Sequence, residues 1–152
     1  MSELGLCSRR EADGYIEKGW VEVDGEIVSE LGSKVYPTQQ VVLRRAAQST
    51  QQQRVTILLN KPIGFVSGQA EHNHKPAVTL IDGATHWAED PSPLRFHRSQ
   101  LLGLAPAGRL DIDSQGLLVL TQDGRIAKQL IGEDSEVDKE YLVRVQGSLK
   151  DT

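Results

Sequence analysis

The sequence has one cysteine, few aromatic residues and no long hydrophobic run. A single cysteine, Cys7, excludes a disulfide framework within the chain and is compatible with a reducing compartment. No apolar stretch approaches the roughly 20 residues that a membrane helix requires. The opening MSELGLCSRREAD lacks the basic and apolar regions of a secretory signal. These absences predict a globular, cytoplasmic protein with no membrane partner.

An excess of positive charge is also absent. The 152 residues include 17 Lys and Arg against 21 Asp and Glu, a formal net charge of −4. Because proteins that coat nucleic acid without selectivity usually have a marked basic excess, any nucleic-acid site here must be local. Basic residues do concentrate early in the chain, at Arg9, Arg10, Lys18, Lys34, Arg44, Arg45 and Arg54. The acidic GEDSEVDKE lies near the other end, and this asymmetry predicts two modules.

The first module, residues 1–45, is predicted to be a small α+β unit. Ser8 followed by Glu11 forms a capping box, so we expect a helix over residues 9–18. VEVDGEIV predicts a hairpin that turns at its Asp-Gly pair, and KVYPTQQVVL predicts a strand ending near Leu43. The polar AAQSTQQQR has nothing to bury, so residues 46–54 are predicted to be a linker.

The second module is predicted over residues 55–152. VTILL indicates a strand, and Phe65-Val66-Ser67 resumes extended structure as a hairpin or strand-turn-strand. Residues 69–104 are irregular, with one short helix expected around 77–82. A buried strand is expected at LLVL, a helix over 124–131 and a last strand at KEYLVRV.

The stretch AGRLDIDSQGLLVLTQDGR crowds Arg109, Asp111 and Asp113 in front of the buried strand. The run LGLCSRREADGYIEKGWVEVDGEIV resembles the small RNA-binding domain named after ribosomal protein S4. LLNKPIGFVS, GRLDIDSQGLLVLTQDG and DKEYLVRV resemble, in the same order, the ribosomal-RNA pseudouridine synthases that carry this domain at their N-terminus. The resemblance implies an α+β chain with a small S4-like domain followed by part of a mixed, largely antiparallel α/β catalytic domain.

The resemblance also implies residue roles. Asp111 matches the catalytic aspartate of the family, Arg109 its neighbour in the motif, and Tyr141 the aromatic residue that lies against the target base. Arg109 and Tyr141 are therefore expected to bind substrate. The RNA-binding residues expected from the basic positions are Arg9, Arg10, Lys18 and Lys61. Of these, Lys61 is expected mainly to shape its loop, with a phosphate contact as a further role.

The chemistry agrees with these residue types. Isomerising uridine to pseudouridine breaks a carbon–nitrogen glycosidic bond, turns the uracil over and rejoins it through carbon, so we expect no cofactor. An aspartate can act as nucleophile or base, and a neighbouring guanidinium favours its ionised form. In an extended segment Arg109 and Asp111 face the same way, because side chains alternate. Stacking of Tyr141 on an extruded uracil is worth about 1–3 kcal/mol.

Other candidate sites are weaker. His72-Asn73-His74 has no cysteine partner and no regular carboxylate spacing, so we predict no metal site. Asp113, Ser114 and Gln115 are expected to hold the turn that enters the strand.

The sequence leaves two alternative functions open. A non-catalytic RNA-binding module associated with the ribosome would use the basic N-terminal residues but would leave GRLD and KEY unexplained. Glycoside hydrolysis by Asp111 and Asp113 needs carboxylates about 5–9.5 Å apart, and the 5% aromatic content does not favour a sugar platform.

The ends of the sequence also differ from the family pattern. Members of the family begin with a complete first helix and continue past the KEY strand, whereas this sequence starts at MSELGLC and ends at KDT. We therefore expect an incomplete first helix and a fragment of the catalytic domain, with little or no isomerase activity by itself.

Overall fold

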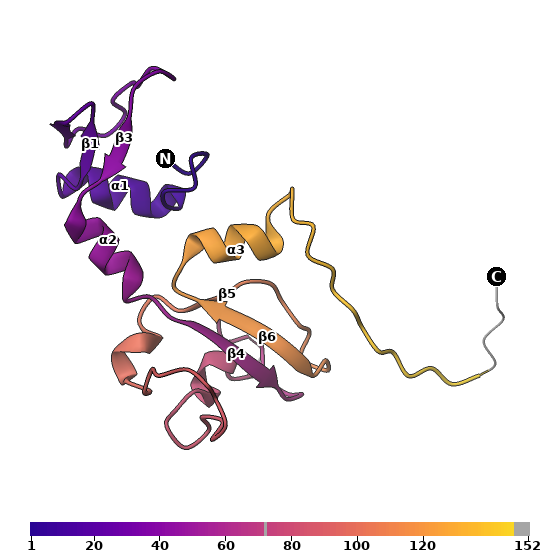
Figure 1. Cartoon of the computed structure of the whole chain (residues 1–152). Helices are drawn as coiled ribbons and strands as arrows, with labels where there is room; N and C mark the ends of the chain where they lie inside the picture. The colour runs from indigo at the N-terminus through magenta and orange to yellow at the C-terminus, as the bar shows by residue number, and fades with distance from the viewer. Residues whose placement is uncertain (72, 148–152) are drawn as a thin grey trace.

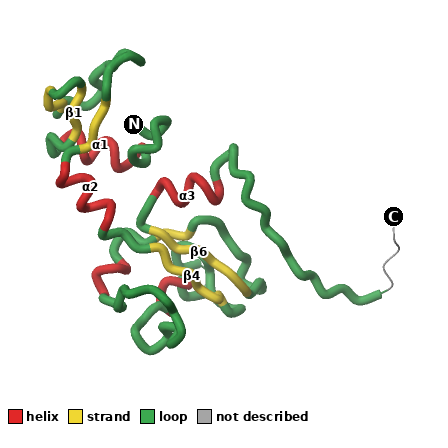
Figure 2. Tube along the Cα trace, in the orientation of Figure 1, coloured by secondary structure: helices red, strands yellow, loops and turns green. Residues whose placement is uncertain are grey.

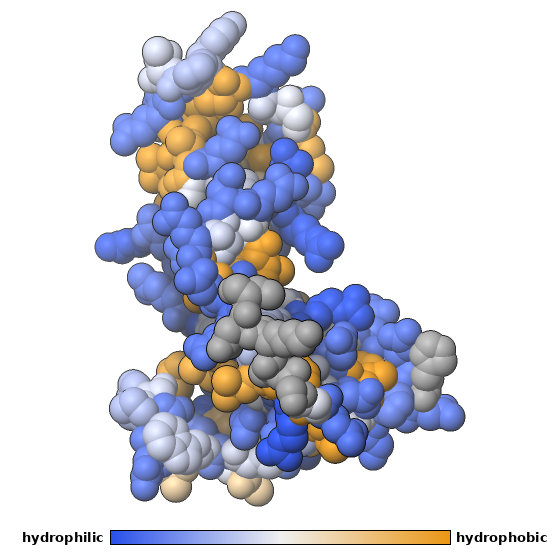
Figure 3. Space-filling model, turned by 90° about the vertical axis from the view of Figure 1, so that its right-hand side faces the viewer, coloured by the Kyte–Doolittle hydropathy of each residue, from blue (hydrophilic) through white to orange (hydrophobic). Residues whose placement is uncertain are grey.

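The computed structural model describes residues 1–71 and 73–147, which form two units in series (Figure 1). The first unit, residues 1–53, holds α1 (Arg9–Glu17), β1 (Val21–Val23), β2 (Glu26–Val28), β3 (Val41–Leu43) and α2 (Arg45–Gln52). The second unit, from residue 54 onward, holds β4 (Thr56–Lys61), η1 (Ala77–Leu80), η2 (Arg98–Leu101), β5 (Ala105–Pro106), β6 (Gly116–Thr121) and α3 (Gly124–Ile131). The space-filling view shows the units as two stacked lobes (Figure 3). Helices combined with antiparallel sheets confirm the predicted fold class.

Local signals set the elements of the first unit. The Ser8 N–H donates to Glu11 Oε2 at 2.6 Å, and this capping box starts α1 where the sequence predicts it. The hairpin between β1 and β2 turns at Asp24 and Gly25, with φ of 50° and 87°. Glycine adopts this left-handed region without strain and aspartate does so more readily than most residues. β3 pairs with the other edge of β1, giving the order β2-β1-β3.

The predicted linker is a helix. α2 places Ala47 in the core of the first unit, fully buried, and Gln48 Nε2 donates to the Leu43 carbonyl at 2.8 Å. The other buried members of this core are Cys7, Tyr15, Val21 and Leu43. The sequence did not predict α2, because a single alanine, and not an apolar stripe, packs against the core of the first unit. α2 then leads directly into β4 (Figure 2).

The second unit is built on a three-stranded antiparallel sheet with the order β4-β6-β5. β4 pairs with β6 along its whole length, and Leu118 and Leu120 of β6 form the buried core of this unit together with Ala77. The strand at LLVL and the helix over 124–131 are confirmed. The predicted hairpin through residues 65–67 does not form, because β4 takes β6 as its partner and Val66 makes only an isolated bridge to Pro76.

The predicted last strand, KEYLVRV, is also not formed. Residues 132–147 leave α3 and run away from the sheet without secondary structure (Figures 1 and 2). Leu142 and Val143 are 95% and 76% exposed. An alternating pattern makes a strand only where a neighbour pairs with its backbone groups, and the described part of the chain supplies none here. Residues 148–152, the end of the predicted second module, lie outside the described residues.

Candidate active site and nucleic-acid interface

The β4–β6 pairing brings two motifs that are distant in sequence to one end of the sheet. Lys61, the last residue of β4, lies opposite Gly116, the first residue of β6. The NKPIGFVS motif therefore continues into a loop over residues 62–67, next to the loop that carries GRLDIDSQ. We call residues 107–115 the Asp111 loop.

Three hydrogen bonds fix the Asp111 loop to the 62–67 loop. The Gly64 N–H donates to the Ile112 carbonyl at 2.8 Å. The Ser67 hydroxyl donates to the Leu110 carbonyl at 2.7 Å and accepts the Leu110 N–H at 2.8 Å. The backbone on both sides of Asp111 is thus held, while Asp111 itself is exposed. This arrangement presents a carboxylate to solvent from a fixed backbone.

Lys61, at the end of β4, is fully buried. Its Nζ donates to the carbonyls of Pro62 and Phe65, both at 3.0 Å. Burial lowers the pKa of the Lys61 ammonium, because a low dielectric disfavours charge, and the nearby carboxylates of Asp111 and Asp113 raise it in part. In this structure the ammonium is taken up by the two loop carbonyls, and the expected phosphate contact of Lys61 stays a prediction.

Arg109 does not pair with Asp111, although a neighbouring guanidinium was expected to favour the ionised carboxylate. Both residues are exposed, and no ion pair joins them although both are described. The carboxylate of Asp111 acts on the pKa of Lys61, at the end of β4, and raises it against the effect of burial. A turn follows Asp111, where the Ser114 N–H donates to the Asp111 carbonyl at 3.1 Å. This bond joins backbone groups, so the expected role of the Asp113, Ser114 and Gln115 side chains in holding the turn stays a prediction.

Tyr141 is not brought to Asp111. It is 61% exposed and belongs to the segment that runs away from α3 (Figure 1). Its expected role against the target base therefore has no geometric support in this conformation and stays a prediction.

The expected RNA-binding residues of the first unit lie on α1. Arg9 and Arg10 occupy its first turn and Lys18 is its C-cap, and all three are exposed. Lys18 Nζ lies 4.7 Å from the centroid of the Trp20 ring. Cations in a first turn oppose the positive end of the helix dipole, so Arg9 and Arg10 do not serve helix stability. Their exposure leaves them available to phosphates.

Two other arginines of the basic N-terminal region are paired within the protein. Arg44 forms an ion pair with Glu22 at 3.1 Å, and Arg54 forms one with Glu11. The sequence does not distinguish these arginines from those of α1, because their carboxylate partners are distant along the chain.

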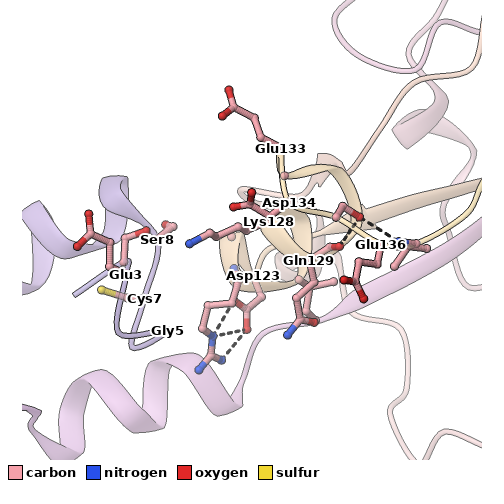
Figure 4. A pocket seen from close by; sticks show the side chains of 17 residues that line it. Glu3, Gly5, Cys7, Ser8, Asp123, Lys128, Gln129, Glu133, Asp134 and Glu136 are labelled. Carbon is pink, nitrogen blue, oxygen red and sulfur yellow. Dashed lines mark hydrogen bonds and ion pairs between the residues drawn. The ribbon is translucent and has the colours of Figure 1, made fainter.

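A wide groove of about 1000 Å³ opens between residues 2–8 and α3 (Figure 4). Its basic lining residues are Arg125 and Lys128. The acidic residues that line it are more numerous: Glu3, Asp123, Glu133, Asp134 and Glu136. The excess of negative charge in the groove repels a phosphate backbone. We therefore place the candidate active site at the Asp111 loop and not in the groove.

Within residues 1–71 and 73–147, no group of three or more His, Cys, Asp or Glu side chains could hold a metal ion. His72 of the HNH run lies outside the described residues. Over the same residues, no helix has the length and apolar character needed to cross a membrane.

Comparison with known families gives two matches along the chain. The family described as RNA pseudouridylate synthase matches residues 54–152, and the S4 domain matches residues 1–41. A crystal structure of a pseudouridylate synthase has a TM-score of 0.37 and 22% sequence identity, covering 80% of this chain and 46% of that chain.

Curated relatives are similar over nearly all of this chain. An uncharacterized RNA pseudouridine synthase of Mycobacterium tuberculosis is 36% identical over 151 residues, which is 98% of this chain and 54% of the relative. Ribosomal large subunit pseudouridine synthase B of Bacillus subtilis is 33% identical, covering 97% of this chain and 54% of the relative. A dual-specificity RNA pseudouridine synthase of Escherichia coli O157:H7 is 34% identical, covering 99% and 47%. The chain therefore spans about half the length of the curated relatives it matches.

Proposed function

Because this chain belongs to the RNA pseudouridylate synthase family and carries an S4 domain, we propose that it isomerises a specific uridine of ribosomal RNA to pseudouridine, with Asp111 as the catalytic residue. The main support for the proposal is the way in which the structure holds Asp111. Its two neighbours are held by the 62–67 loop while its own side chain is exposed. A fixed backbone beneath an accessible carboxylate meets the need for a reacting group held in one geometry.

In this proposal the Asp111 carboxylate attacks the substrate as a nucleophile or acts as a base while the glycosidic bond is broken and remade. Lys61 and Ser67 are positioning residues, since both are buried: Lys61 binds two carbonyls of the 62–67 loop, and Ser67 joins that loop to the Asp111 loop. Arg109 is exposed on the same loop as Asp111 and is proposed to bind the substrate nucleotide. Tyr141 is proposed to contact the target base. This role requires residues 139–145 to lie against the second unit when RNA is bound.

The first unit is proposed to hold the RNA. Arg9, Arg10 and Lys18 offer three exposed cations on α1 for phosphate contacts, and such contacts position an RNA without reading its sequence. The Bacillus subtilis relative is named as a synthase for the ribosomal large subunit, and we propose ribosomal RNA as the substrate class here. This substrate agrees with the cytoplasmic location expected from the sequence.

The test is a map of pseudouridines in ribosomal RNA from cells with and without the gene. The proposal predicts that at least one pseudouridine disappears without the gene and returns when the gene is restored. An unchanged map would contradict it and would favour the RNA-binding module without catalysis.

A further inference from the structure

The two units meet where two helices begin. α1 starts after Ser8 and α3 starts after Asp123. A Cβ atom on Gly124 would lie 2.5 Å from Ser8 Cβ and 2.8 Å from Ser8 Oγ, so only glycine allows this approach. Figure 4 shows Ser8 and Asp123 on the two facing sides of the groove that opens beside this contact.

Two helix N-termini that meet need negative charge between them, because each carries a positive partial charge. Each helix has a carboxylate for this purpose. Glu11 Oε2 accepts the N–H of Ser8, and Asp123 Oδ1 accepts the N–H of Arg125 at 2.9 Å. Each carboxylate therefore caps its own helix at the contact.

The first carboxylate also binds an arginine of the other unit. Arg54, two residues before β4, forms an ion pair with Glu11 and donates from Nη2 to the Tyr15 hydroxyl at 2.9 Å. The side chains of Arg54 and Glu11 are only 14% and 13% exposed. Removing one partner of a buried ion pair leaves an uncompensated charge, so this pair resists separation of the units.

The second carboxylate binds an arginine that reaches α2. Arg125 Nη2 donates to Asp123 Oδ2 at 2.6 Å, and its Nη1 lies at the longer distance of 3.5 Å from Gln51 Oε1. Gln51 in turn donates from Nε2 to the Leu6 carbonyl at 2.7 Å. We call Glu11, Arg54, Asp123, Gly124 and Arg125 the junction.

We propose that the junction fixes Arg9 and Arg10 of α1 relative to Asp111, so that Arg54 and Gly124 are positioning residues that determine which nucleotide reaches the site. This inference rests on the proposed function. Arg9 and Arg10 follow Ser8 directly, so a displacement at the Ser8–Gly124 contact moves these cations relative to the second unit. Phosphates of one strand of a DNA duplex lie about 3.4 Å apart along the axis, so a displacement of a few ångströms is on the scale of one nucleotide step.

Gly124→Ala tests the junction without removing any charge, and Gly14→Ala is its matched control. Gly14 lies in α1, and a Cβ atom added there meets nothing within 4 Å. Alanine favours a helix over glycine in both places. Spin labels on cysteines placed at the exposed Glu26 and Gln115 measure the distance between the units. The distance distribution is expected to shift or broaden in Gly124→Ala and to stay unchanged in Gly14→Ala.

Arg54→Gln tests the ion pair, and Arg44→Gln is its control because the Arg44–Glu22 pair lies within the first unit. Arg54→Gln is expected to broaden the distance distribution and Arg44→Gln to leave it unchanged. If Arg54→Gln fails to fold, as judged by circular dichroism, Gly124→Ala decides the question.

Kinetics on two RNAs then separate positioning from general damage. With folded ribosomal RNA, Gly124→Ala is expected to raise KM about tenfold with little change in kcat, the factor that follows if the displaced α1 loses one charged hydrogen bond between an arginine and a phosphate. With a short RNA that reaches only the second unit, KM is expected to match that of the parent. Unchanged distances, or shifted distances with equal kinetics on both RNAs, would overturn the inference. A pseudouridine map that does not change with the gene would overturn the proposed function and leave the distance test standing.

Discussion

The Ser67 hydroxyl closes two hydrogen bonds with the backbone of Leu110, donating to its carbonyl at 2.7 Å and accepting its N–H at 2.8 Å. Leu110 directly precedes Asp111, so a buried serine from the 62–67 loop holds the residue before the proposed catalytic aspartate. The geometry of the site therefore depends on a contact between two loops that are distant in sequence.

Ser67→Ala is expected to destabilise the protein by about 1–3 kcal/mol, because it leaves the partly buried N–H and carbonyl of Leu110 without the Ser67 hydroxyl as their partner. Urea unfolding measures this free energy. Ser33→Ala is the control, since the Ser33 hydroxyl bonds the Glu30 carbonyl at an exposed site, and its effect is expected to stay within about 0.5 kcal/mol. Equal effects of the two substitutions would show that Ser67 does not hold the Asp111 loop.

Lys61→Met is expected to change how stability depends on alkaline pH. The pKa of Lys61 is lowered in the folded protein, mainly by burial. Between the folded pKa and the unfolded value of about 10.4, the unfolded chain binds more protons, so the stability of the parent rises with pH. The free energy of unfolding of the parent minus that of Lys61→Met should increase towards pH 10.

Urea unfolding between pH 7 and 10 measures this difference for Lys61→Met. Lys75→Met, at an exposed lysine, controls for the loss of one positive charge. A difference that stays constant over this range for Lys61→Met would contradict the burial of a charged lysine at the end of β4.

Asp123→Asn is expected to lower the free energy of unfolding by about 1 kcal/mol at neutral pH. This is a low value for a charged hydrogen bond, because the Arg125 side chain is 38% exposed and solvent screens the pair. Asparagine keeps the helix cap. The hydrogen bond from Arg125 lowers the pKa of Asp123, so its contribution is present above the unfolded pKa of about 3.9 and is lost as pH falls through the folded pKa.

The difference in unfolding free energy between the parent and Asp123→Asn should therefore shrink below about pH 4. Asp13→Asn, at an exposed position on α1, is the comparison and is expected to have little effect at any pH. A cost for Asp123→Asn that persists unchanged into acid would show that charge is not what Asp123 contributes.

Elements with a local signal could be predicted from the sequence. The Ser8–Glu11 capping box set the start of α1, and the Asp-Gly pair set the β1–β2 turn. α2 was missed because its contact with the core is made by Ala47, in a segment that is otherwise polar. The strand expected at KEYLVRV was wrong because strand formation needs a partner, which no alternating pattern encodes.

The candidate site was predictable only in part. The GRLD motif pointed to Asp111, and the structure shows that residue exposed on a loop that is held on both sides. The burial of Lys61 and the contacts of Ser67 depend on the register between β4 and β6, which neither segment specifies alone. The contribution of Arg54 likewise needs the packing of α1 against the second unit.

Neutralising α1 is expected to weaken RNA binding and flatten its salt dependence. Each phosphate that Arg9, Arg10 or Lys18 no longer neutralises reduces the slope of log K against log salt by about 0.7–0.9. Replacing all three with glutamine should therefore lower the slope, whereas exchanging each arginine for lysine and the lysine for arginine should preserve it. Salt titrations that overlay those of the parent for the glutamine variant would show that α1 does not face the RNA.

The central claim is that Asp111 performs the chemistry, and its neighbour Asp113 provides a matched comparison. Both aspartates are exposed on the same loop and both act on the pKa of Lys61, so only their position differs. The most direct measurement is the pseudouridine map of ribosomal RNA from cells whose only copy of the gene carries Asp111→Asn or Asp113→Asn. We predict that Asp111→Asn loses the gene-dependent pseudouridine, because the amide is neither a nucleophile nor a base near neutral pH, and that Asp113→Asn retains it. A modified uridine that persists in cells with Asp111→Asn would contradict the account.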